Sequence, residues 1–111
     1  MEHEKLMHDL IVSRLKGKFA GLYKEITINS DGNPDLVLSS HGLTLAVVQV
    51  ETDTGITPER AEKWKELAQS GSKLILMVPK NAKAKVMDLL WKSGIADKVG
   101  VGSYEIAIHM P

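Results

Sequence analysis

The hydrophobic and polar positions change their period along the chain, and each change marks a predicted element. From about residue 3 to residue 17, apolar side chains recur every three or four positions, which predicts a helix. Residues 22–29 alternate between apolar and polar, as in a strand with one buried face. Two aliphatic runs, 36–38 and 43–50, predict two more strands. The second run is almost continuous, so we expect it to be buried on both faces of a sheet.

Two further helices are predicted in the second half of the chain. Thr57 is a good N-cap and Pro58 suits the first helical position, and the helix that they begin ends at Gly71. A second helix begins with Asn81 as its N-cap and ends at Gly94.

The apolar run 73–78 lies between these two helices and predicts a strand. A strand–helix–strand connection of this length implies a parallel, right-handed crossover beside strand 43–50. We expect residues 95–102 to form a loop and residues 104–108 to form a last strand at a sheet edge. The predicted order is α-β-β-β-α-β-α-β, an α/β fold in which a mixed central sheet has helices on both faces. Residues 1–111 form one domain.

Composition excludes several classes of site. The chain has 43% hydrophobic and 25% charged residues, which is ordinary for a soluble globular protein. Because it has no cysteine, disulfides, thiolate zinc sites and cysteine nucleophiles are excluded. It has no apolar stretch of about 20 residues that could span a membrane, and we expect a cytoplasmic protein. Basic and acidic residues are equal in number, at 14 each, so nucleic-acid binding would depend on a local basic patch.

Three polar side chains interrupt the apolar hairpin at its open end. If residues 40–42 form a three-residue turn, Asp35 lies opposite Val47 and Gln49 is its diagonal neighbour, roughly 7–8 Å away. Glu51 follows two residues later on the same face. A two-residue turn would move Asp35 to the opposite face of the sheet.

This constellation has two interpretations. Hard cations such as Mg²⁺ and Mn²⁺ bind oxygen ligands, usually one or two carboxylates, and a metal-bound water can attack a phosphodiester. Alternatively, the three residues form a solvated turn at the end of the hairpin. Spacing alone favours the solvated turn.

The hairpin resembles the signature of the PD-(D/E)XK nuclease superfamily, which has the restriction-endonuclease-like fold. Its pattern is Pro-Asp at a strand start, then acidic-x-Lys at the end of the next strand. Here Pro34-Asp35 matches the first half, and Gln49-Val50-Glu51 occupies the second. The resemblance implies that Asp35 is a metal ligand, that Gln49 takes the place of the second acidic ligand, and that Glu51 takes the place of the catalytic lysine. It also implies a helix, three meandering strands, a crossover helix and a fourth strand.

The departures from this pattern affect the chemistry. Gln49 offers a neutral oxygen, which is a weaker ligand for a hard cation than a carboxylate. Glu51 could supply the missing carboxylate, so that Asp35 and Glu51 hold Mg²⁺ or Mn²⁺ together. A lysine from the next helix, Lys63 or Lys65, could replace the motif lysine.

Other charged and aromatic residues have two interpretations each. Superfamily members often place a glutamate of the first helix beside the metal, and Glu4 is the candidate here, although a glutamate in a first turn also favours the helix dipole. Lys80, Lys83 and Lys85 crowd the start of the last helix and form either an anion-binding edge or a solvated surface. We expect Trp64 to anchor the core rather than to stack on a base.

Three functions follow. The first is a metal-dependent nuclease-like enzyme that acts on DNA phosphodiesters, as a homodimer because the chain is too short for a separate recognition domain. The second is a non-catalytic nucleic-acid- or protein-binding module that keeps the nuclease-like fold. It is favoured by the absence of the motif lysine, the neutral Gln49 and the balanced charge. The third, an unrelated α/β domain that binds a small ligand, has no glycine-rich phosphate loop to support it.

Overall fold

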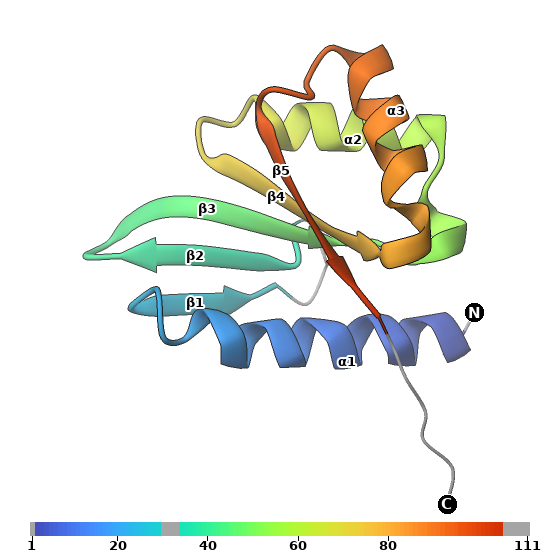
Figure 1. Cartoon of the computed structure of the whole chain (residues 1–111). Helices are drawn as coiled ribbons and strands as arrows, with labels where there is room; N and C mark the ends of the chain where they lie inside the picture. The colour runs from blue at the N-terminus through green and yellow to red at the C-terminus, as the bar shows by residue number, and fades with distance from the viewer. Residues whose placement is uncertain (1, 30–33, 106–111) are drawn as a thin grey trace, which may run out of the picture.

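A mixed five-stranded sheet forms the centre of the fold (Figure 1). The computed structural model describes residues 2–29 and 34–105, with side chains from residue 5 onward. In sheet order, the strands are β1 (Glu25–Ile28), β2 (Leu36–Ser40), β3 (Leu43–Val50), β4 (Lys73–Pro79) and β5 (Val99–Tyr104). β1, β2 and β3 form an antiparallel meander, whereas β3, β4 and β5 are mutually parallel. We call the end at which these three parallel strands finish the carboxyl end of the sheet.

Helices cover both faces of the sheet, as predicted (Figure 1). α1 (Glu2–Phe19) lies on one face, and α2 (Pro58–Ala68) and α3 (Lys83–Ser93) lie on the other. The 3₁₀ turns η1 (Asp53–Gly55) and η2 (Lys80–Ala82) precede α2 and α3. No helix among the described residues is long and apolar enough to cross a membrane. Because α2 follows β3 and α3 follows β4, both helices begin at the carboxyl end of the sheet.

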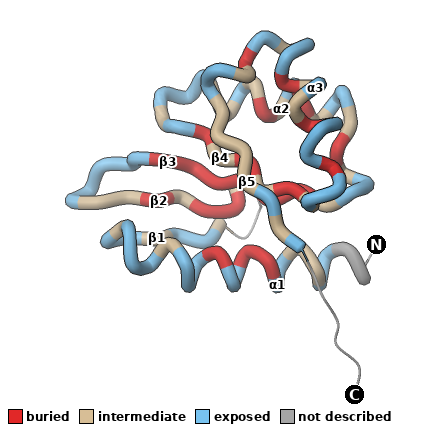
Figure 2. Tube along the Cα trace, viewed as in Figure 1, coloured by how far each residue is buried: buried red, intermediate tan, exposed pale blue. Residues whose placement is uncertain are grey.

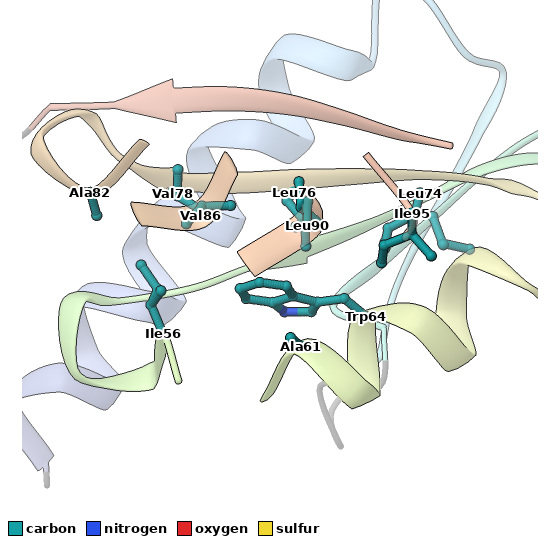
Figure 3. Close-up of a cluster of buried hydrophobic side chains, with 11 residues drawn as sticks. Ile56, Ala61, Trp64, Leu74, Leu76, Val78, Ala82, Val86, Leu90 and Ile95 are labelled. Atoms are coloured by element: carbon teal, nitrogen blue, oxygen red, sulfur yellow. The ribbon is translucent and has the colours of Figure 1, made fainter. Parts of the chain in front are cut away.

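Alternating side chains of the central strands build two cores, which appear as the red segments of Figure 2. Leu74, Leu76 and Val78 of β4 pack against α2 and α3, with Trp64 fully buried among them (Figure 3). Trp64 is therefore a core anchor, as predicted. On the other face, α1 packs against residues of β2 and β3.

The helix and first strand predicted near the N-terminus both form, with different bounds and burial. The predicted apolar stripe of α1 is only partly buried, because Leu6 and Leu10 are 70% and 52% exposed whereas Ile11 and Leu15 face the core. The first strand is shorter than predicted and mostly exposed. The turn predicted just before Pro34 lies outside the described residues.

The hairpin turn differs from the prediction, but Asp35 still lies on the predicted face of the sheet. The turn has two residues, since Ser40 pairs with Leu43, and His41 and Gly42 both adopt positive φ (53° and 78°), as in a type I′ turn. A β-bulge then places Leu45 in β3 as an extra residue. Beyond the bulge, the two-residue turn and the bulge together shift the register by two residues from the prediction, so Asp35 and Gln49 stay on their expected face.

The end of the chain departs most from the prediction. Residues 99–104, most of which were expected to be a loop, form the edge strand β5, whereas residues 106–108 of the predicted last strand lie outside the described residues. Asn81 is not an N-cap, because η2 precedes the helix and Ala82 occupies that position without a side-chain cap. Alternating glycines made the segment look like a loop, but they let β5 lie close to the side chains of β4. A Cβ placed on Gly102 would lie 2.5 Å from Met77 Sδ.

We therefore expect Gly102→Ala to lower the free energy of unfolding by about 1 kcal/mol, because Met77 must move from its packed position. Gly17→Ala is the matched control. Gly17 is an exposed residue of α1 with open space around its Cβ position, so the same change should stabilise by about 0.5–1 kcal/mol. Urea denaturation measures both. Equal effects of the two substitutions would contradict the proposed close approach of β5 to β4.

Candidate functional site at the carboxyl end of the sheet

The three polar residues of the hairpin come together as a buried cluster. Asp35, Gln49 and Glu51 are 2%, 3% and 3% exposed and are the buried polar or charged residues of the described chain. Leu36 pairs with Val48, so Asp35, one residue earlier, lies beside Gln49. The sequence therefore predicted their proximity, but these residues are not the solvated turn that spacing alone favoured.

Asp35 is engaged by α1 and by β3. Its Oδ1 lies 3.0 Å from His8 Nε2, and its Oδ2 accepts the backbone N–H of Val50 at 2.8 Å. The hydrogen bond to Asp35 raises the pKa of His8 to about 9, although partial burial of the ring opposes this rise. At neutral pH His8 is therefore a cation that neutralises Asp35.

Glu51 is engaged from the opposite face, by α2. Its Oε2 accepts a hydrogen bond from Trp64 Nε1 at 2.7 Å and lies 3.4 Å from Arg60 Nε. Its backbone is also held, because the Tyr104 hydroxyl donates to its carbonyl oxygen at 2.6 Å. Burial raises the pKa of the Glu51 carboxyl, against the opposing effects of the Trp64 hydrogen bond and the Arg60 charge.

Gln49 is the exception within the cluster. Its Oε1 is buried and has no hydrogen-bond partner, and it is the one such side-chain atom in the part of the chain that the structure describes. A buried acceptor without a donor costs free energy, so this atom is where a bound water or ion would be stabilised.

Most carboxylate oxygens of the cluster are engaged by donors of the protein, which leaves few of them for an octahedral Mg²⁺ or Mn²⁺ ion. Within residues 5–29 and 34–105, no group of three or more His, Asp or Glu side chains is placed to hold a metal ion. Both oxygens of Asp35 already have donors, and Oε2 of Glu51 has two. A Mg²⁺ ion needs free carboxylate oxygens and retains several waters, for which side chains at most 3% exposed leave little access.

No family model, curated protein or solved structure matches this chain. The site must therefore be interpreted from its own contacts.

The lysines predicted for the site lie on α2, immediately before and after Trp64, and therefore on other faces of the helix than this tryptophan, which donates to Glu51. Lys63 and Lys65 are half-buried, and neither forms an ion pair with Asp35 or Glu51 among the described residues. The cation at Glu51 is Arg60. The side chain of Glu4 lies outside those described.

Sequence reasoning did not assign a site role to His8, Arg60, Trp64 or Tyr104. One signal was available for two of them, because Arg60 and Trp64 are four apart on a helix and so share a face. Thr57 caps this helix, and its side chain accepts the N–H of Arg60 at 3.1 Å. The helix begins shortly after β3 ends, so this face starts close to the end of β3. His8 and Tyr104 are distant in sequence, and no local pattern links them to the hairpin.

Basic residues of α2 and of the start of α3 lie at the same end of the sheet as the buried cluster. A surface hollow of about 430 Å³, which we call the α2 hollow, is lined by Thr54, Gly55, Thr57, Glu59, Arg60 and Lys63. At the start of α3, exposed Lys80, Lys83 and Lys85 add three positive charges. Lys80 lies 3.5 Å from Glu105, an exposed pair that contributes little to stability. The carboxyl end of the sheet therefore presents cations from two helices, alongside the acidic Asp53, Glu59 and Glu105.

Proposed function

We propose that this chain is a non-catalytic nucleic-acid-binding domain that keeps a restriction-endonuclease-like fold and binds DNA through its phosphate backbone. The observation that carries the proposal is that Arg60 and Lys63 of α2 line a surface hollow and the lysines at the start of α3 lie at the same end of the sheet, next to carboxylates that are already paired with His8 and Arg60.

The element order supports the fold assignment. The structure has the order α-β-β-β-α-β-α-β, with a meander of three strands followed by a crossover helix and a parallel fourth strand. This is the order that the sequence resemblance implies. The position of Asp35 beside Gln49 also agrees with the motif. Because one fold serves many functions, the activity must be argued from the site.

The contacts of the two carboxylates support a structural role. In a metal-dependent nuclease these oxygens would be free to coordinate an ion, whereas here His8 neutralises Asp35 and Arg60 neutralises Glu51. Buried charges persist in proteins when they are paired and hydrogen-bonded, and both of these are. The cluster therefore joins α1 and α2 to the end of the hairpin.

The cations support DNA binding. Phosphate contacts from Lys and Arg supply most of the affinity of sequence-independent binding, and five such residues line the α2 hollow or lie around the start of α3 (Arg60, Lys63, Lys80, Lys83 and Lys85). With its phosphate contacts made by these residues, the chain would bind DNA with the carboxyl end of the sheet toward the duplex.

One observation favours the metal-dependent nuclease as a second candidate. Gln49 Oε1 is buried without a donor next to Asp35, and an ion would satisfy it. A metal bound to Asp35 and Gln49 would need the carboxylate oxygen of Asp35 that His8 now contacts. Binding a metal there would therefore require His8 to leave Asp35.

A metal titration and a plasmid assay separate the two candidates. We expect wild-type protein to bind a fluorescein-labelled DNA duplex, with an affinity that falls steeply as salt rises. We also expect calorimetry to detect no Mn²⁺ or Mg²⁺ binding and supercoiled plasmid to stay intact with either metal.

Asp35→Ala is the control for any cleavage that is observed. Nicking that requires Mn²⁺ and disappears in Asp35→Ala would establish the second candidate. Nicking that is equal in both proteins arises from a contaminant, because Asp35 belongs to every version of the site.

A further inference from the structure

Arg60 is held in place from inside the protein. Its Nε lies 3.4 Å from Glu51 Oε2, and the same oxygen accepts the indole N–H of Trp64. Glu51 is buried, its carboxylate accepts the Trp64 N–H, and its carbonyl oxygen accepts the Tyr104 hydroxyl, so both its side chain and its backbone are held in place. The guanidinium is thus oriented by a fixed partner.

The rest of the Arg60 side chain faces outward. It is 41% exposed and lines the α2 hollow together with Lys63, which lies three residues later on the same side of the helix. One terminal amino group of Arg60 lies 3.8 Å from the Cβ position of Gly55, which places the guanidinium against η1. Glu59 is the single carboxylate among the residues that line the hollow.

This geometry suits an anion with tetrahedral oxygens. A guanidinium whose Nε faces a carboxylate keeps donors on its terminal nitrogens, and the planar arrangement of those donors matches the oxygens of a phosphate. Lys63 adds a second positive charge across the hollow. Fixing the arginine beforehand reduces the entropy that binding must remove.

We propose that the α2 hollow is a phosphate-binding subsite in which Arg60 donates to the phosphate, Lys63 supplies charge, and Glu51 is a positioning residue for Arg60. The inference rests on the proposed function for its natural ligand, the phosphodiester backbone of DNA. A free phosphate or a small phosphate ester presents the same group, and the experiment distinguishes these sources.

The test compares two lysines on one helix. Lys63→Gln removes a charge from the hollow, whereas Lys65→Gln removes one from a half-buried lysine that does not line it. By fluorescence anisotropy with a short labelled duplex, Lys63→Gln should raise Kd about three- to tenfold and reduce the salt slope by about one, because one phosphate contact is lost. Lys65→Gln should leave both quantities close to wild type.

Two further variants test the role of Arg60 and Glu51. Arg60→Lys keeps the charge but lacks the paired donors, so it should also weaken binding. Glu51→Gln keeps an acceptor for Trp64 but removes the charge that orients Arg60. The Arg60 Nε–H resonance should then exchange faster with water while thermal unfolding remains cooperative, which a purely structural role for Glu51 would not produce.

Inorganic phosphate, titrated into ¹⁵N-labelled protein, identifies the source of the ligand. Shifts at Gly55, Arg60 and Lys63 that are lost in Lys63→Gln support the subsite. If the same protein does not bind the duplex, the subsite stands and the DNA-binding function fails. If the duplex binds and Lys63→Gln behaves like Lys65→Gln, the function stands and the subsite is overturned.

Discussion

Asp35→Asn is expected to lower the free energy of unfolding by about 2–3 kcal/mol at neutral pH. The substitution keeps the size of the side chain but removes the buried carboxylate from the His8 cation, which is 27% exposed and keeps only the exposed Asp9 at 3.2 Å. It also replaces a charged acceptor for the Val50 N–H by a neutral one. Urea denaturation followed by circular dichroism measures the change.

The sign of this change in the free energy of unfolding distinguishes a metal-binding role of the cluster from a structural ion pair. Carboxylates held together for a metal repel one another when the metal is absent, so removing one charge would stabilise the protein. Carboxylates paired with internal cations are destabilised by the same change. Asp97→Asn, at an exposed position, is the control and should stay within about 0.5 kcal/mol of wild type. A more stable Asp35→Asn protein would contradict the structural ion pair.

A double-mutant cycle with His8→Gln assigns the effect to the pair. If the two side chains stabilise the protein through their mutual contact, the double variant should be less destabilised than the sum of the single variants. Additive effects would mean that Asp35 acts mainly through the Val50 N–H.

The second large effect is a loss of stability at alkaline pH. The pKa of His8 is raised from 6.5 to about 9 in the folded protein, so the folded state binds more protons than the unfolded state between these values. The stabilisation is fully present below pH 6.5 and is lost as the pH rises through about 9. We expect a fall of at most about 3 kcal/mol across this window, because each unit between the two pKa values corresponds to about 1.4 kcal/mol.

His8→Gln provides the control for this pH dependence. Unfolding free energies measured from pH 6 to pH 10 should decline for wild type and stay nearly level over that window for the variant. Parallel curves for the two proteins would show that another group titrates in this range.

Helices and strands could be predicted wherever buried positions recur with a regular period in the sequence. The aliphatic run of β3 and the Thr57-Pro58 start of α2 were sufficient to place a strand and a helix, and both are confirmed. β5 was missed because Gly100 and Gly102 leave too few apolar residues to reveal a strand. Its pairing depends on the side chains of β4, which no local pattern contains.

The cluster could be predicted in its membership but not in its contacts. Asp35 and Gln49 were placed together although the turn was assigned one residue too many, because the bulge in β3 makes up the difference. His8 and Arg60 reach the carboxylates from helices on opposite faces of the sheet. Such pairings depend on where each helix packs, and spacing within the hairpin carries no information about that.

The extra residue Leu45 also constrains how the hairpin can change in length. Losing one residue from the hairpin would turn Asp35 toward the other face of the sheet, while losing two, one from each strand, would leave it in place. Among related sequences, insertions and deletions in this hairpin should therefore occur in pairs, or should be accompanied by a new bulge. The length of the hairpin and the position of the Asp35 side chain therefore cannot change independently.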